Sequence, residues 1–204
     1  MGKTRPPEKS KARVVRDKAY QIVRPAQLRA LVSPMRGEVY EQVYAFGPIS
    51  VKEVAALMGV APASLYYHIE HLIRVGLLIE AGERATGKRP EQLYDVPARP
   101  MRMLSALQEP RNEKIFKALS ASLCRQANKD FARGFAASHR KTSGRARNVR
   151  LARLLCRPDA ATLAQVNAHF DAISDLIEAS ADGVGERVSF TWVVSPQRRK
   201  AGGP

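Results

Sequence analysis

The sequence predicts a mainly α-helical fold with one small β hairpin, a helical region behind it and a final β-strand. Three observations support this prediction. Residues 50–76 hold two short amphipathic segments separated by a glycine, residues 77–96 place apolar residues around glycines and a proline, and apolar residues recur at helical spacing over 111–137 and 159–177. We therefore divide the chain into a disordered basic tail (1–18), a first domain (19–98), a helical region (99–196) and a disordered tail (197–204).

Two helices are predicted between Ser50 and Gly76. Ser50 and Glu53 have the S-x-x-E spacing of a capping box, in which each side chain bonds the backbone N–H of the other residue. Gly59 ends the first helix, because glycine readily adopts the left-handed conformation. Pro62 lies near the first turn of the second helix, whose predicted buried face is Leu65, Ile69, Leu72 and Ile73.

The outward face of the second helix predicts contact with a nucleic acid. A small residue (Ala55) in the first helix, a glycine in the turn and apolar positions on either side are typical of a helix-turn-helix, whose second helix enters the major groove. If Leu65 faces the core, Ala63, Ser64 and Tyr67 point outward near the helix start. Tyr67 can stack or bond to a phosphate, and Ser64 can bond to a base or a phosphate.

A β hairpin is predicted directly after this helix pair. Its first strand begins at 77–79, Gly82, Gly87 and Pro90 mark its turns, and its returning strand holds Leu93, Tyr94 and Val96. We expect Arg84, Lys88 and Arg89 at its tip, where a basic hairpin can act as a wing on the DNA backbone or in the minor groove. The alternative is a solvated loop whose charges serve solubility.

The residues expected to contact DNA lie on both helices and on the hairpin. The set is Lys52, Pro62, Ala63, Ser64, Tyr66, Tyr67, His71, Arg84, Lys88 and Arg89.

Two prolines organise the segment before the helix pair. Residues 19–24 are expected to be a short extended piece. Pro25 opens a helix, and Pro34 opens the next one, because proline suits the first turn of a helix. Val39, Val43 and Phe46 then fall at helical spacing, and Gly47-Pro48 ends the helix.

Residues 20–96 resemble the arsenic-repressor-type (ArsR-like) winged-helix transcriptional regulators. The resemblance rests on QLRALVSPMRGEVYEQV, VKEVAALMGVAPASLYYHIEHLIRVGLL and GERATGKRPEQLYDV, and its best motif is LYYHIEHL followed by GLL. It implies a winged-helix fold, operator binding by the second helix and the wing, a homodimer, and a scaffold role for His68. Metal-sensing members carry cysteine-rich motifs here, whereas this chain has no cysteine before Cys124, so the resemblance implies no thiolate metal site.

The long stretch over 111–137 predicts a helix that needs a partner. Its apolar residues recur every four positions, and they either pack inside their own subunit or pair across a dimer axis. Asp159 can cap the next helix, whose apolar residues follow the 3-4-3-4 spacing of a paired helix. The residues expected at the dimer interface are Ile115, Leu119, Leu123, Phe131, Phe135, Val166, Phe170, Ile173 and Ile177.

Two parts of the second half keep alternative interpretations. Residues 138–158 carry seven basic and no acidic residues, so they form either a second phosphate-contacting surface or a solvated loop. Val188, Phe190, Trp192 and Val194 alternate with other residues and predict a half-buried strand. Its partner is 19–23, the wing or a strand of the other subunit.

The formal charge of +15 suggests a polyanionic partner, although residues 25–97 hold seven basic and eight acidic residues and are nearly neutral. We find no catalytic motif, no convincing metal site around His68 and His71, no cofactor motif and no apolar run long enough to cross a membrane. The two cysteines are expected to pack rather than to bind metal, and the expected location is the cytoplasm.

The predicted function is that of a sequence-specific, homodimeric, DNA-binding transcriptional regulator without enzyme activity. An unknown small-molecule effector is compatible with the helical region. The alternatives are a nonspecific nucleoid-type DNA- or RNA-binding protein and a winged helix that serves as a protein-interaction module.

Overall fold

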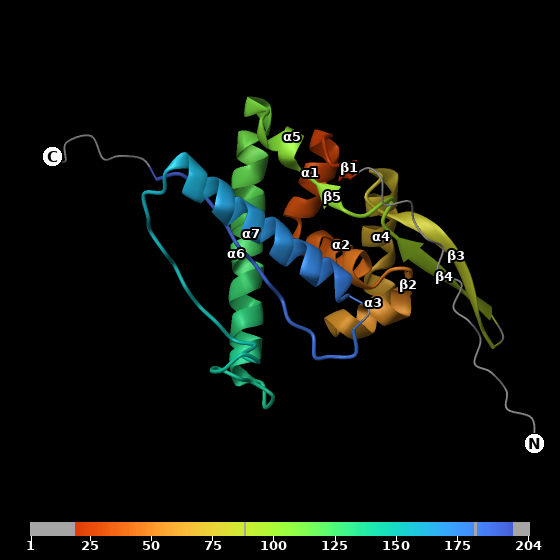
Figure 1. Ribbon diagram of the computed structural model, residues 1–204. Helices are drawn as coiled ribbons and strands as arrows, with labels where there is room; N and C mark the ends of the chain where they lie inside the picture. Colours follow the sequence, from red (N-terminus) through yellow and green to blue (C-terminus); the bar gives the residue numbers. More distant parts are fainter. Residues whose placement is uncertain (1–18, 88, 182, 198–204) are drawn as a thin grey trace, which may run out of the picture.

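The computed structural model describes residues 19–87, 89–181 and 183–197, and Figure 1 shows their arrangement. The expected disordered tail over 1–18 and most of the one over 197–204 lie outside these residues. The described chain is mainly helical, with a three-stranded antiparallel sheet and a two-stranded parallel one. The predicted fold class is thus right in its helices and its hairpin, and it is wrong in its final strand.

The first two helices begin at the two prolines. Helix α1 spans Pro25–Val32 and α2 spans Pro34–Phe46. Each begins with proline, which lacks a backbone N–H, and at the first position of a helix this N–H would have no acceptor within the helix. Leu28, Val39 and Val43 are fully buried. These two helices therefore supply one wall of the hydrophobic core.

The helix pair follows, with the predicted capping box at its start. Strand β2 (Ile49–Ser50) leads into α3 (Val51–Met58), where the Ser50 hydroxyl accepts from the Glu53 N–H and the Glu53 carboxylate accepts from the Ser50 N–H at 2.9 Å. Gly59 ends α3 in the left-handed conformation, as predicted. A 3-10 turn, η1 (Pro62–Ser64), precedes α4 (Tyr66–Arg74), so the second helix begins later than Pro62.

The hairpin forms a three-stranded sheet with β2. Strand β3 spans Ile79–Thr86 and β4 spans Arg89–Asp95, and β4 lies between β3 and β2. The hairpin projects from the helical body on the right of Figure 1. Its base is anchored by Tyr94 and Val96, which are buried in the core. Its far end is exposed on both strands.

The expected extended piece near the start is β1 (Tyr20–Gln21), which pairs in parallel with β5 (Met101–Arg102). This pairing brings the start of the first domain beside the segment that leaves it. The short helix α5 (Leu104–Leu107) and the 3-10 turn η2 (Pro110–Asn112) then lead into α6 (Glu113–Ala136).

Helix α6 packs against α1 along its first half. Leu119 is buried there, and Ile115 and Leu123 pack against the same core. Farther along, Phe131 is half-buried and Phe135 is exposed, with their rings 5.9 Å apart. The first half of α6 therefore packs inside its own subunit, as one of the two predicted alternatives stated.

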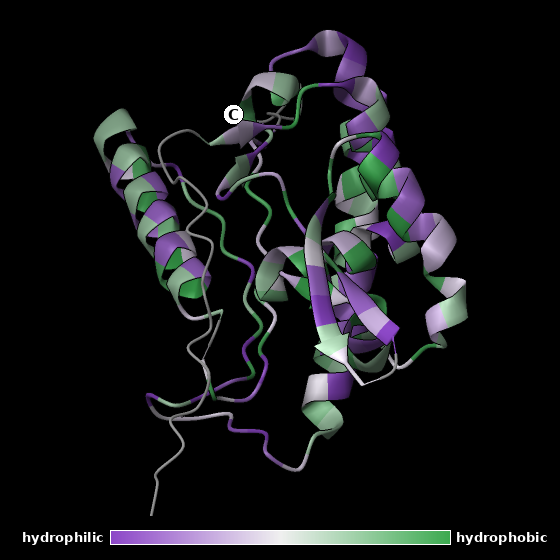
Figure 2. Ribbon diagram, turned by 90° about the vertical axis from the view of Figure 1, so that its right-hand side faces the viewer, coloured by the Kyte–Doolittle hydropathy of each residue, from purple (hydrophilic) through white to green (hydrophobic). Residues whose placement is uncertain are grey.

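Helix α7 (Ala160–Ala179) lies on the outside of the molecule, at the left of Figure 2. The Asp159 carboxylate caps it by accepting from the Thr162 N–H at 2.7 Å, as predicted. No residue of α7 is buried. Its contacts with the first domain lie near its end, where the Glu178 carboxylate accepts from the Tyr44 hydroxyl at 2.9 Å and pairs with Arg102 at 3.3 Å.

The predicted strand over 188–194 is wrong, because residues 186–197 form no helix or strand. The alternating pattern is compatible with a strand, but a strand needs a partner for its backbone groups. Within the described chain β1 pairs with β5, and the hairpin strands pair with each other and with β2. Trp192 instead stacks on Phe170 of α7 with the ring centroids 5.6 Å apart.

The expectation that the cysteines pack in the interior is also wrong, because Cys124 and Cys156 are both exposed. The buried apolar face of α6 is therefore narrower than the sequence suggests, because it does not include Cys124. Among the described residues, no helix is long and apolar enough to cross a membrane.

Candidate nucleic-acid interface

Helix α4 buries one face and exposes the other. Leu65, Ile69 and Leu72 are completely or almost completely buried, which fixes the rotation of the helix about its axis. The opposite face exposes Tyr66 and Tyr67, whose exposed fractions are 50% and 65%. Two aromatic side chains this exposed at the start of a helix are unusual without a partner, because tyrosine normally buries its ring.

The turn before α4 adds three small exposed residues to this surface. Pro62, Ala63 and Ser64 form η1 and are all exposed. The Ser64 hydroxyl donates to the Ala61 carbonyl at 2.7 Å, so its proton is already used and its lone pairs remain for an incoming donor. The sequence correctly predicted that these residues and Tyr67 lie together on the outer surface.

The far end of α4 is held by residues that the sequence did not single out. The Arg24 guanidinium donates to the Val75 carbonyl, and the Tyr20 hydroxyl donates to the Gly76 carbonyl at 3.0 Å. Gln27 in turn donates to the Tyr20 hydroxyl at 3.1 Å. An arginine in the sequence does not by itself indicate which helix end it will bind. Only the fold brings Arg24 to a helix that ends 50 residues later.

Two of the predicted basic residues are held in an ion-pair network between α3 and the hairpin. Arg84 pairs with Glu53 at 2.8 Å and with Glu91 at 3.0 Å, and Lys52 pairs with Glu91 at 3.3 Å. Arg84 lies within β3 opposite Glu91 and not at the hairpin tip, which corrects the predicted position. Hydrogen bonding by Arg84 lowers the pKa of the Glu91 carboxyl, so Glu91 is charged at neutral pH.

Another predicted basic residue lies near the hairpin tip. Arg89 begins β4 opposite Thr86 and is exposed. Lys88 lies outside the described residues. The tip is the part of the hairpin farthest from the core, so a charge there can reach a partner that the helices do not touch.

The two histidines of α4 are neutral near pH 7. Burial, followed by the nearby Arg36 guanidinium, lowers the pKa of His68 and of His71. His71 is half-buried, so it is at the edge of the exposed face. Among the described residues there is no group of three or more His, Cys, Asp or Glu side chains that could hold a metal.

The apolar residues predicted for a dimer interface fall into two groups. Three of them, Ile115, Leu119 and Leu123, pack in or against the core of their own subunit. By contrast, the residues on α7 and the end of α6 are exposed or only half-buried, namely Phe131, Phe135, Val166, Phe170, Ile173 and Ile177.

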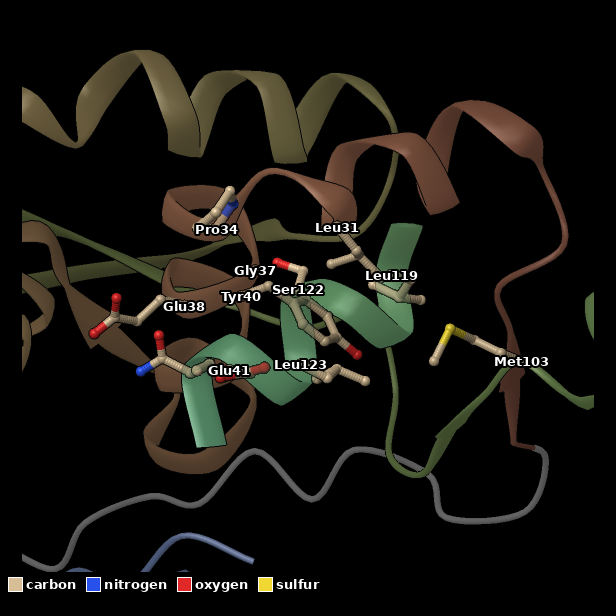
Figure 3. Close-up of a pocket in the computed structure, with 11 residues that line it drawn as sticks. Leu31, Pro34, Gly37, Glu38, Tyr40, Glu41, Met103, Leu119, Ser122 and Leu123 are labelled. Atoms are coloured by element: carbon tan, nitrogen blue, oxygen red, sulfur yellow. The ribbon is translucent and has the colours of Figure 1, made fainter. Parts of the chain in front are cut away.

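A small cavity lies between α1, α2 and α6. Figure 3 shows Leu31, Leu119 and Met103 toward one end of it and Glu38 toward the other. Its volume is about 90 Å³, whereas pockets for drug-sized ligands have roughly 300–1,000 Å³. The cavity is thus a packing gap at the junction between the first domain and α6.

A comparison with protein families gives a match to part of the chain. A family model described as a helix-turn-helix domain matches residues 31–80, which includes α2, α3, η1 and α4. No curated protein matches the chain. The chain thus contains a helix-turn-helix domain, and this domain indicates a DNA-binding regulator.

Proposed function

We propose that this protein is a sequence-specific, DNA-binding transcriptional regulator that acts as a homodimer in the cytoplasm and has no enzyme activity. In this proposal residues 19–98 are a winged-helix DNA-binding domain of the arsenic-repressor type. Helix α4 enters the major groove, and the hairpin β3–β4 is a wing on the backbone or in the minor groove. Residues 99–196 join the two subunits.

The exposed start of α4 is the observation that carries the proposal. The buried Leu65, Ile69 and Leu72 leave Tyr66 and Tyr67 on the exposed face of α4. The first turn of a recognition helix is where base edges are normally contacted. In addition, residues 31–80 match a helix-turn-helix domain.

A dimer gives the geometry needed for an operator. Two copies of α4 about 34 Å apart can enter successive major grooves on one side of the duplex. The exposed apolar residues of α7 support such a dimer, since a paired-helix spacing normally has a partner. Arg89 and the basic residues of the first tail would neutralise phosphates, which makes the affinity fall as the salt concentration rises.

Selection of DNA fragments tests the proposal directly. The full-length protein is mixed with a pool of fragments from the genome that encodes it, at about 150 mM salt, and the retained fragments are sequenced. We expect a shared, two-fold symmetric motif with half-sites about one helical turn apart. Retention without any shared motif would overturn the regulator proposal.

The second candidate function is nonspecific binding to DNA or RNA. It is favoured by residues 138–158, which hold seven basic and no acidic residues. A chain without residues 1–18 and with the basic residues of 140–157 neutralised separates the two functions. A regulator keeps its operator preference, whereas a nonspecific binder loses most of its affinity. A protein-interaction module, the third candidate, would bind no DNA at all.

A further inference from the structure

The largest concentration of positive charge on the described chain lies behind the helix-turn-helix, at the end of α6 and beyond it. From Arg125 to Arg157 the chain holds ten basic residues and one acidic residue, so this stretch carries +9 of the total +15. We call residues 138–158 the basic segment. It joins α6 to α7 and lies away from the hairpin in Figure 1, at the lower end of α6 and along the left of the view.

The charges of the basic segment face solvent and have no acidic partner among the described residues. All seven basic residues are exposed, and none takes part in the ion pairs of the described chain. They are Arg140, Lys141, Arg145, Arg147, Arg150, Arg153 and Arg157. By contrast, Lys52 of α3 and Arg84 of β3 both form an ion pair with Glu91.

Part of the basic segment is a closed loop. The Lys141 N–H donates to the Asn148 side-chain oxygen at 2.8 Å, and the Asn148 N–H donates to the Lys141 carbonyl at 2.9 Å. Gly144 turns the loop in the left-handed conformation, with φ of 73°. Arg145 and Arg147 are therefore held together in one small loop, although their charges repel each other.

Helix α6 extends this charged surface. Arg125, Lys129 and Arg133 are four residues apart, so they lie on one face of the helix, and all three are exposed. The face leads toward Arg140, whose guanidinium lies over the Phe135 ring at 4.5 Å. The result is a continuous run of cations from the second half of α6 into the loop.

We propose that the basic segment binds the phosphate backbone of double-stranded DNA as a second contact, separate from α4 and the hairpin. This inference rests on the proposed function in taking DNA as the partner. Arginine suits phosphate because its planar guanidinium donates two parallel hydrogen bonds. The contact is independent of sequence, because the basic segment has no helix or hairpin that could enter a groove.

The composition of the basic segment favours a duplex over other polyanions. Single-stranded nucleic acids are bound with aromatic side chains on which the bases stack, and residues 138–158 contain no Phe, Tyr or Trp. An amphipathic helix binds a lipid surface by burying a continuous apolar face, whereas Leu151, Leu154 and Leu155 lie on a non-helical stretch.

The test compares two full-length variants with equal charge loss. R145Q/R147Q/R150Q removes three charges of the basic segment, and R111Q/K114Q/K117Q removes three exposed charges at the opposite end of α6. Binding of a random-sequence duplex of about 30 base pairs is followed by fluorescence anisotropy between 50 and 200 mM salt. Three lost phosphate contacts reduce the slope of log affinity against log salt by about 2.7, so over this range the wild type should lose about 40-fold more affinity than the first variant.

The control variant should keep a slope within about one of the wild-type slope. The proposal is overturned if both variants lose the same slope or if the first variant keeps the wild-type slope. It is also overturned if the wild type does not bind the duplex at 50 mM salt. Loss of binding only to a single strand, or only to vesicles of anionic lipid, would identify a different partner.

Failure of the proposed function gives a different result from failure of this inference. Sequence preference is measured as the ratio of affinities for a selected and a scrambled duplex, and it should be equal in the wild type and the first variant. A wild type without such a preference but with the expected change in slope refutes the regulator and supports the second contact. Thermal unfolding of both variants confirms that they are folded.

Discussion

Tyr67 is the residue best placed to contribute to sequence preference. It is the more exposed of two tyrosines at the start of α4, and its neighbour Leu65 fixes its direction by burial. Its hydroxyl has no hydrogen-bond partner within the described chain, so it is available to a ligand. Its ring lies 5.5 Å from that of His68, which supports it from the inner side.

Replacing Tyr67 with alanine should lower sequence preference and leave the salt dependence unchanged. The affinity ratio between a selected and a scrambled duplex should fall about 5- to 150-fold, the range of about 1–3 kcal/mol for a good base contact. Competition anisotropy measures the ratio. Glu70→Ala, an exposed position farther along α4, is the control and should keep the ratio. An unchanged ratio in Tyr67→Ala would remove this residue from the reading surface.

Two glycines with the same backbone conformation differ in what surrounds them. Gly59 and Gly76 have φ of 69° and 75°, but a Cβ on Gly59 would meet no atom within 4 Å, whereas one on Gly76 would lie 2.9 Å from the Arg24 guanidinium. Gly59→Ala should lower the free energy of unfolding by about 1–2 kcal/mol, through backbone strain alone. Gly76→Ala should cost about 1 kcal/mol more, because Arg24 must leave the Val75 carbonyl.

Urea denaturation of both glycine variants measures this difference. Equal losses of stability would mean that the contact of Arg24 with the end of α4 contributes nothing to the folded state. The variant Arg24→Ala provides an independent check, since Gly76→Ala should add only its backbone cost on that background.

At the scale of elements, Arg99 joins the end of α2 to the end of β4. It donates to the carbonyls of Tyr44 at 3.0 Å and Val43 at 3.2 Å, and it pairs with the buried Asp95 at 2.5 Å. The last carbonyls of a helix lack intrahelical partners, so the guanidinium satisfies the Tyr44 carbonyl, whereas the Val43 carbonyl also accepts from the Gly47 N–H at 2.8 Å. The hairpin is thereby fixed to the helical body at its base.

Arg99→Ala should therefore destabilise the protein strongly. It leaves the Asp95 carboxylate buried without its cation, which costs about 2–3 kcal/mol in a partly exposed pair. Arg102→Ala removes a more exposed ion pair, with Glu178, and should cost less than about 1 kcal/mol. Chemical denaturation of the two variants compares them, and similar losses would contradict the role given to Asp95.

The network of Lys52, Arg84 and Glu91 limits the charge that the hairpin offers to DNA. Glu91→Gln should strengthen binding to a duplex and steepen the salt dependence by about one, because it removes one negative charge and releases Lys52, whereas Arg84 keeps its ion pair with Glu53. Glu83→Gln removes the same charge from the same hairpin, at an exposed position outside the ion pairs of the described chain. Anisotropy titrations measure the duplex affinity of both variants and its salt dependence. An equal effect in both variants would mean that only the net charge of the hairpin matters.

At the scale of the whole molecule, α7 is a 20-residue helix without a buried residue. Its apolar residues keep a paired-helix spacing, and Ile173 is 42% exposed. Its docking on the first domain is polar, through Glu178 with Tyr44 and Arg102. Pairing with α7 of a second copy would cover the apolar residues without disturbing these contacts.

Ile173→Asp should convert the proposed dimer into a monomer while the fold is kept. A buried, unpaired carboxylate at a helix interface costs several kcal/mol, whereas in the single subunit the residue is exposed. Ala164→Asp adds the same charge on the opposite, exposed side of α7 and should leave the dimer intact. Sedimentation velocity gives the masses, and a dimeric Ile173→Asp variant would exclude this part of α7 from the interface.

The sequence by itself determined those features that depend on neighbours along the chain. The Ser50–Glu53 capping box, the left-handed Gly59 and the buried Leu65–Leu72 face of α4 follow from spacing and from single-residue preferences. The exposed start of α4 follows from the same face, because the residues between buried ones must point outward. This is why the exposure of the candidate residues at the start of α4 could be predicted from the sequence.

Only the tertiary structure decided the features that depend on a partner distant in sequence. In the sequence, Arg84 cannot be distinguished from a free basic residue of a wing. In the structure, it forms ion pairs with Glu53 and Glu91. The pattern over 188–194 is that of a strand, but these residues pair with no strand of the described chain. Charge and alternation describe what a segment can do, whereas hydrogen bonds and ion pairs require two groups to meet, and the fold alone brings them together.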